Sequence, residues 1–266
     1  MRKGSSKEWP LIDAYGIVRQ SVLPLYVRPT EDSALVTQLL FGECYLITGL
    51  TSDRQWFRAS HTDSGYSGWV GAKSIKEITA DAYDTFLNQD FQVVTSPMAA
   101  ISYQGASLYL LPGSRLHFSE NELFNWQDHL GFLGTYRPHA LKAGREELVD
   151  LALRFLHAPF QAGGRSIFGL DAKHAFPLLV AMAGYTWPAD HLPGRRISPE
   201  EAVPGDLMVV KVGGVPLVAH FGLYLGAEEL LWMDHRMQVT DMQDWEDFLD
   251  DTFAEAVVFE AYSLVG

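Results

Sequence analysis

Short apolar runs separated by turn-forming residues fill the first part of the chain. These runs lie at 22–27, 36–40, 44–48, 56–59 and 65–70. Pro24 lies inside the first run, and the segment 28–32 that follows it has the composition of a turn. Five short strands in such close succession predict a small closed β-barrel.

A second part of the chain, 79–140, is also rich in strand-like runs. Thr79 is a candidate N-cap for a short helix at its start. Beyond that helix, the apolar run 108–111 leads into a turn at 112–114, and a glycine-flanked apolar pair follows at 131–134. This pattern predicts a second small β-barrel that is less regular than the first.

The remaining residues, 141–266, place helices before strands. Apolar side chains at i, i+3, i+4 and i+7 predict an amphipathic helix through Leu148, Leu151, Ala152 and Phe155. An apolar segment of helical length follows at 175–184. Strand-like runs then lie at 207–211, 221–225, 230–233 and 257–262. Helices followed by antiparallel strands predict an α+β domain.

Composition narrows the possible partners. The net charge of -13 argues against nucleic acid and against anionic membrane surfaces, since both require a basic face. No run approaches the roughly 20 apolar residues of a membrane helix. The polar N-terminus lacks the apolar segment of a secretory signal, so we expect a cytoplasmic protein as the sequence stands, or a periplasmic or cell-surface protein if a signal was removed. Cys44 is the single cysteine, so we expect a buried structural thiol and no intramolecular disulfide.

Three stretches of the last part, 159–171, 204–207 and 220–226, together resemble the NlpC family of papain-like cell-wall peptidases. The run order in 1–78, with Gly68-Trp69 near its end, resembles a bacterial SH3 domain, and 79–140 resembles a degenerate one. The resemblance therefore implies an α+β chain in which two small SH3-like β-barrels precede a papain-like NlpC domain at 141–266. It also implies an enzyme that cleaves between D-glutamate and the diamino acid of peptidoglycan stem peptides.

The chemistry of that family requires a Cys nucleophile, a His base and a third polar residue that orients the imidazole. The resemblance places these roles at Ala172, His220 and Trp232. A methyl group has no lone pair to attack a carbonyl, and an indole donates one N–H but accepts nothing. We therefore expect no intact catalytic residues and treat these three positions as vestigial. Trp232 is larger than His, so we expect its indole to lean toward His220 and fill part of the site.

Pro177 lies five residues after Ala172, inside the helix that would carry the nucleophile. An interior proline removes a helix hydrogen bond and clashes with the carbonyl four residues earlier, at a cost of about 3 kcal/mol. The sequence predicts that the helix begins later, between Lys173 and Phe176, unless it is merely kinked.

Ligand binding is a function that such a chain can keep. The candidate residues are Tyr66, Asp171, Lys173, His174 and His220. The resemblance implies that Tyr66 lines the peptide cleft and that Asp171 holds a substrate amine. Each residue could instead have a purely structural role. Tyr66 could lie on the barrel surface, Asp171 could only cap the helix, and His220 could be a hydrogen-bonded core residue.

We expect no cofactor and no metal, although Asp171, His174, His220, Asp234 and His235 are the residues a metal site would use. The favoured hypothesis is an inactive homologue that binds a cell-wall peptide, a muropeptide fragment or a protein partner. One alternative is an active hydrolase with displaced catalytic residues, which would use Ser166 with Lys173, His174 and His220. The other is an interaction protein whose interface lies on the SH3 domains and does not involve the cleft.

Overall fold

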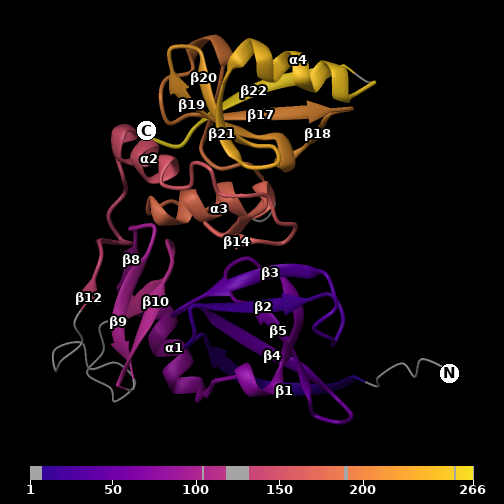
Figure 1. The fold of residues 1–266 in the computed structure, drawn as a ribbon, viewed down its shortest axis with the longest axis vertical. Helices are drawn as coiled ribbons and strands as arrows, with labels where there is room; N and C mark the ends of the chain where they lie inside the picture. Colours follow the sequence, from indigo (N-terminus) through magenta and orange to yellow (C-terminus); the bar gives the residue numbers. More distant parts are fainter. Residues whose placement is uncertain (1–7, 104, 118–131, 189–190, 255, 266) are drawn as a thin grey trace. The chain divides into compact units, whose positions relative to one another are not determined.

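The computed structural model describes residues 8–103, 105–117, 132–188, 191–254 and 256–265. The chain forms two compact units, 1–138 and 139–266 (Figure 1). Each unit combines helices with antiparallel strands, in agreement with the predicted α+β class. The proposed division of the chain at 78 and 140 stays a prediction, and part of its second segment, 118–131, lies outside the described residues.

The first unit opens with a seven-stranded antiparallel sheet. Its strands are β1 (Glu8–Ile17), β2 (Val22–Tyr26), β3 (Leu35–Leu40), β4 (Cys44–Thr51), β5 (Trp56–His61), β6 (Ser67–Gly71) and β7 (Glu77–Ile78), with the short helix η1 (Ala72–Ser74) before β7. Their order across the sheet is β3-β2-β6-β5-β4-β1-β7. Along β2 and most of β4, buried residues alternate with more exposed ones because side chains on a strand alternate between its two faces.

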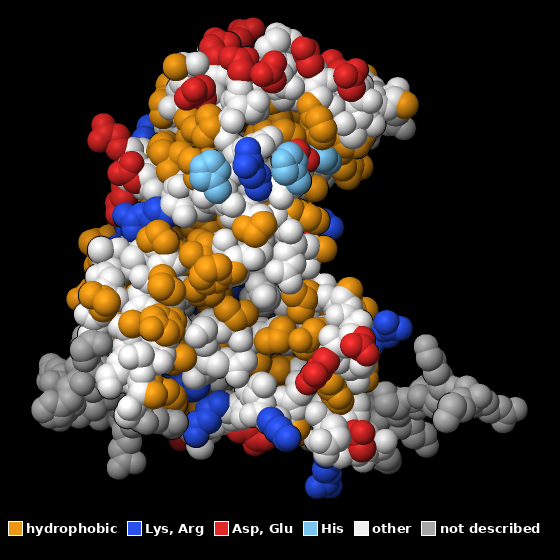
Figure 2. Space-filling model, viewed as in Figure 1, with side chains coloured by type: hydrophobic (Ala, Val, Ile, Leu, Met, Phe, Trp, Pro, Cys, Tyr) orange, Lys and Arg blue, Asp and Glu red, His pale blue; other side chains and the backbone are white. Residues whose placement is uncertain are grey.

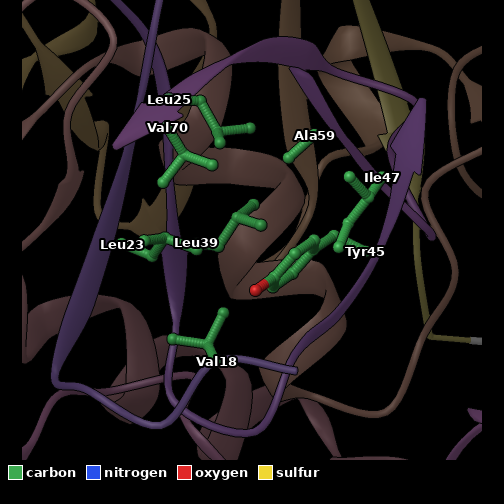
Figure 3. Packing of buried hydrophobic residues seen from close by; sticks show 8 residues of the cluster. All are labelled: Val18, Leu23, Leu25, Leu39, Tyr45, Ile47, Ala59 and Val70. Atoms are coloured by element: carbon green, nitrogen blue, oxygen red, sulfur yellow. The ribbon is translucent and has the colours of Figure 1, made fainter. Parts of the chain in front are cut away.

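These buried residues form one hydrophobic cluster (Figure 3). Its members are Val18, Leu23, Leu25, Leu39, Tyr45, Ile47, Ala59 and Val70. The Tyr45 ring is fully buried among them, and its hydroxyl accepts a hydrogen bond from the Lys76 N–H at 3.2 Å. The aromatic ring thus contributes apolar area to the core while its polar end has a partner.

Residues 79–138 complete the first unit. They contain α1 (Ala80–Asn88), β8 (Phe91–Val94), β9 (Ala99–Tyr103), β10 (Ala106–Leu110), β11 (Arg115–His117), β12 (Phe132–Leu133) and β13 (Tyr136–Pro138). The strands form two three-stranded sheets, β10-β9-β12 and β11-β8-β13. As the sequence predicted, the hydroxyl of Thr79 caps α1 and accepts a hydrogen bond from the Ala82 N–H.

Phe41 joins the two parts of this unit. It follows β3, yet its buried ring belongs to the cluster formed by Val94, Ala99, Ile101, Leu110 and Leu116. The Arg115 N–H donates to the Phe41 carbonyl at 2.7 Å. Gly42 has a φ of +82°, and a Cβ there would come within 2.1 Å of the Arg115 carbonyl oxygen. A side chain at position 42 would therefore break this junction.

Buried polar groups lie beside the junction. Arg115 forms an ion pair with Asp63, and the Glu43 carboxylate, 1% exposed, accepts a hydrogen bond from the Leu40 N–H. His117 bonds the Gly42 carbonyl through Nε2 at 2.9 Å. Cys44 is buried as expected, and burial raises its pKa to about 12. The thiol is therefore protonated at neutral pH.

The second unit holds the remaining elements. In chain order they are α2 (Arg145–Leu153), β14 (Arg165–Ser166), β15 (Gly169–Leu170), α3 (Ala172–Met182), β16 (Arg195–Ile197), η2 (Pro199–Glu201), β17 (Leu207–Val212), β18 (Val215–Pro216), η3 (Val218–His220), β19 (Gly222–Gly226), β20 (Glu229–Met233), β21 (Met237–Asp241), α4 (Met242–Thr252) and β22 (Val257–Ser263). The large sheet has the order β16-β22-β17-β19-β20-β21, and β18 pairs with β17.

Helices α2 and α3 pack against each other, and α4 follows directly from β21 (Figure 1). The sheet and α4 share a buried cluster made of Met208, Val210, Leu230, Trp232, Trp245, Leu249 and Ala261. An ion pair between a half-buried Arg145 and the fully buried Asp206 ties the start of α2 to the loop before β17, because Arg145 Nη1 lies 2.6 Å from Asp206 Oδ1. Arg145 Nη2 also donates to Ser263 Oγ and to the Val265 carbonyl.

The start of α3 differs from the prediction. The helix begins at Ala172 and continues to Met182 with Pro177 inside it, so the expected later start between Lys173 and Phe176 is wrong. The Asp171 side chain caps the first turn, which gives the helix a favourable N-terminus despite its interior proline. None of the helices in the described part of the chain is long and apolar enough to cross a membrane.

Candidate functional site

Asp171 fixes the N-terminus of α3. Its Oδ1 accepts a hydrogen bond from the Lys173 N–H and its Oδ2 accepts one from the Gly163 N–H, both at 3.0 Å. Its own N–H donates to the Gly164 carbonyl at 3.0 Å. The carboxylate therefore holds the loop 163–170 against the helix. It remains able to accept further bonds, because two carboxylate oxygens offer about four acceptor sites.

Ala172 is the first residue of α3, and it is buried at 2% exposure. The next two residues point in different directions, since Lys173 is exposed and His174 is buried. The positive end of the helix dipole thus lies at a methyl group. Ser166, the hydroxyl considered as a displaced nucleophile, is also buried and accepts a hydrogen bond from the Phe168 N–H.

His220 ends the short helix η3, which packs against α3. The edge of its half-buried imidazole meets the ring of Phe253 at a centroid distance of 5.3 Å. Desolvation by burial lowers the pKa of His220, and the negative charge of Asp234 partly opposes this shift. His220 is therefore neutral at pH 7. Its Nδ1 is buried and has no hydrogen-bond partner among the residues that the structure describes.

Trp232 lies in the core of the second unit at 3% exposure. It pairs with Gly222 across β19 and β20, and its ring meets that of Phe248 at 5.1 Å. Trp232 belongs to the buried cluster that the sheet shares with α4, and the expected lean of its indole toward His220 stays a prediction. The Phe248 ring contacts both side chains, with its centroid 6.5 Å from the imidazole. Trp232 Nε1 is buried, and no atom within the described ranges accepts a hydrogen bond from it.

The sequence reasoning missed the aromatic residues of α4 and its C-terminal end. Phe248 is partly exposed and Phe253 is half-buried, and both contact His220. A usable signal was present, since Trp245, Phe248 and Leu249 follow the i, i+3, i+4 spacing of an amphipathic helix.

The metal hypothesis gains no geometric support from these residues. Asp234 acts electrostatically on His220 and lies 2.5 Å from Nδ1 of the exposed His235. Across the described ranges, no group of three or more His, Cys, Asp or Glu side chains is arranged to hold a metal ion.

Tyr66 lies in the first unit, immediately before β6. Its side chain is exposed, and its N–H approaches Ser64 Oγ at 3.5 Å. A role for Tyr66 in a peptide cleft stays a prediction.

Comparison with known proteins identifies similar sequences for both units. Residues 25–75 match the family described as the bacterial dipeptidyl-peptidase SH3 domain. The chain is 25% identical over 222 residues to the gamma-D-glutamyl-L-lysine dipeptidyl-peptidase of Bacillus subtilis (strain 168). That alignment covers 75% of this chain and 72% of the relative.

Solved structures share the fold. An NlpC/P60 family protein from Bacillus cereus ATCC 10987 superposes with a TM-score of 0.69 at 19% identity, over 86% of this chain and 94% of that one. An NlpC/P60 endopeptidase from Photobacterium damselae subsp. piscicida gives a TM-score of 0.66 at 13% identity, over 95% of this chain and 73% of that one. These likenesses, together with the SH3 match, confirm the predicted fold class.

Proposed function

We propose that this chain, which belongs to the NlpC-type cell-wall peptidase family, binds a peptide or a protein partner without cleaving peptide bonds. The observation that carries the proposal is the position of Ala172. Its helix begins where a nucleophile would gain most from the dipole, and the side chain there is a methyl group. The scaffold for covalent catalysis is thus present without an atom that could form the covalent bond.

The surroundings of His220 support the same proposal. A general base in this chemistry needs an orienting partner on one ring nitrogen and a proton donor at the other. Among the described residues Nδ1 of His220 has no hydrogen-bond partner, and Trp232, which the resemblance places at the orienting position, lies in the core and can only donate. The neutral imidazole retains hydrogen-bonding capacity, which suits it to recognition.

The ligand we propose is a cell-wall peptide or muropeptide fragment. The Bacillus subtilis relative is named for a gamma-D-glutamyl-L-lysine peptide, and the similarity spans both units of this chain. Lys173 is exposed beside the capping carboxylate of Asp171, so one anionic and one cationic group are available at the start of α3. Such a pair is complementary to a short zwitterionic peptide.

Two measurements on the purified chain test the proposal. We expect calorimetry to detect binding of an L-Ala-γ-D-Glu-L-Lys peptide, and chromatography to detect no cleavage above a buffer blank. Turnover that disappears in His220→Ala would contradict the absence of catalysis. It would favour the alternative of an active hydrolase with displaced residues.

The variant Ala172→Cys tests how much of the site has been lost. We expect it to leave the chain inactive, because His220, the base that the resemblance implies, has no orienting partner among the described residues even when the thiol is restored. Ala172→Ser is the matched control for a change of volume. Cleavage by the Cys variant alone, at a rate typical of peptidases, would show that one substitution accounts for the loss.

A further inference from the structure

The turn between β20 and β21 lies beside the segment that follows α2. The His157 N–H donates to the Met237 carbonyl, and the Met237 N–H donates to the Ala158 carbonyl, both at 2.8 Å. Further along, the Phe160 N–H donates to the His235 carbonyl at 2.8 Å. These bonds pair the two segments, so their exposed side chains lie on neighbouring stretches of the surface, while Ala158 and Met237 are buried.

That surface carries cationic and imidazole groups, which we call the cationic strip and define as His157, His235 and Arg236. All three are exposed. Arg236 forms no side-chain hydrogen bond or ion pair with any residue that the structure describes, whereas His235 Nδ1 is paired with Asp234 at 2.5 Å. Figure 2 shows His side chains beside a cationic side chain on the visible face of this unit.

The backbone at His157 is an independent observation on the same surface. Its φ of +69° lies in the left-handed region, where a non-glycine residue costs roughly 1 kcal/mol. The position lies three residues after Arg154, the C-cap of α2. An imidazole is thus held on this surface at a conformational cost. Because strained residues often lie at functional sites, this geometry motivates a functional reading of the strip.

We propose that the cationic strip binds the carboxylate of a peptide. The planar guanidinium of Arg236 offers a fork of donors that matches a carboxylate, and the two imidazoles offer N–H groups beside it. Phe160 is 51% exposed next to the strip and would contact an apolar neighbour of the acidic group. The net charge of -13 repels a phosphate dianion more strongly than a single carboxylate.

The proposed ligand group has two possible sources, an acidic side chain or a free peptide C-terminus. The binding contacts use neither Ala172 nor His220. If the cationic strip does not bind a carboxylate, the proposed function still stands or falls on the binding and cleavage measurements described for it.

Calorimetry on the full chain with three short peptides provides the test. One peptide is blocked at both ends and carries one Glu and one Phe, the second has Gln for Glu and a free C-terminus, and the third has Gln and both ends blocked. We expect at least one of the two peptides that carry a carboxylate to bind, and the third peptide not to bind. Whichever of the first two binds more tightly shows whether the strip recognises an acidic side chain or a free C-terminus. Equal binding of all three would overturn the proposal.

Variants locate the contact. We expect Arg236→Gln to weaken binding about tenfold or more, and Arg236→Lys to weaken it less, because the charge remains while the fork is lost. Arg195→Gln is the matched control, since Arg195 is an exposed arginine of β16 in the same unit. Equal losses in Arg236→Gln and Arg195→Gln would overturn the proposal. Displacement of the peptide by an equal concentration of inorganic phosphate would overturn the choice of a carboxylate.

Discussion

Asp206 belongs to 204–207, one of the stretches that resemble the NlpC family, and its role in this chain is structural. Its fully buried carboxylate bonds Arg145 through Oδ1 and accepts the Val203 N–H through Oδ2 at 2.9 Å. Arg145 in turn bonds Ser263 and Val265. One ion pair thereby joins α2, the loop before β17 and the end of the chain.

Removing this carboxylate should destabilise the second unit. We expect Asp206→Asn to lower the free energy of unfolding by about 2–4 kcal/mol, since it leaves a half-buried guanidinium without its counter-charge. Urea denaturation followed by tryptophan fluorescence measures the change. Asp250→Asn, on the exposed face of α4, is the control and should change stability by less than about 0.5 kcal/mol. Similar values for both variants would mean that the ion pair contributes little.

A second residue-scale prediction concerns acid. Burial lowers the pKa of His117 from 6.5 to about 4, with a smaller opposing effect from its bond to Gly42. The unfolded chain therefore binds a proton before the folded one does. This group contributes full stability above about pH 6.5, and roughly 3 kcal/mol of it is lost as the pH falls to about 4.

The variant His117→Gln isolates that contribution, because its amide can still donate to the Gly42 carbonyl but does not titrate. We expect the loss of stability between pH 7 and pH 4 to be about 3 kcal/mol smaller in this variant. Chemical denaturation at several pH values gives the comparison. Parallel pH profiles for the two proteins would place the acid sensitivity elsewhere.

At the scale of elements, Pro177 is the clearest conflict between local preference and fold. It removes one backbone donor from the interior of α3, which nevertheless extends from Ala172 to Met182. We expect Pro177→Ala to raise the free energy of unfolding by about 1–2 kcal/mol, since the regained hydrogen bond outweighs the greater freedom of the unfolded chain.

Pro199 provides the matched control because it occupies the first turn of η2, where proline is favoured. Pro199→Ala should give a loss of about 0.5 kcal/mol. Thermal unfolding by circular dichroism distinguishes the two. A loss of stability in Pro177→Ala would show that the proline ring contributes packing that the alanine cannot replace.

The sequence predicted elements well where local pattern decides structure. The runs at 22–27, 36–40 and 56–59 correspond to β2, β3 and β5, because alternation along a strand is a local property. The start of α3 was predicted wrongly because the cap formed by Asp171 acts together with the burial of Ala172, His174 and Ala175 in the first turns, and this packing cannot be read from local preference. Phe248 and Phe253 were missed because their contact with His220 depends on how α4 packs against the sheet.

At the scale of the molecule, the position of Phe41 determines which pieces can fold. Its ring is buried in the core of residues 79–138, although it is connected to β3. A fragment ending at residue 78 would expose this ring. It would also lack Arg115, so Asp63 would lose its ion-pair partner.

We expect residues 1–138 to fold cooperatively as a separate polypeptide and residues 1–78 to be destabilised by at least about 3 kcal/mol, the usual cost of losing a buried phenylalanine. Denaturation of both fragments measures the difference. Equal stability would show that the first barrel does not depend on its neighbour.

The buried state of Cys44 offers a chemical tool. Its thiol is 4% exposed and protonated at neutral pH, so alkylating reagents should leave it almost untouched. A cysteine introduced at any exposed position would then be the single labelled atom in the folded chain. Two introduced cysteines, one in each unit, could carry a pair of fluorophores or spin labels that report the distance between the units in solution, without first removing the native cysteine.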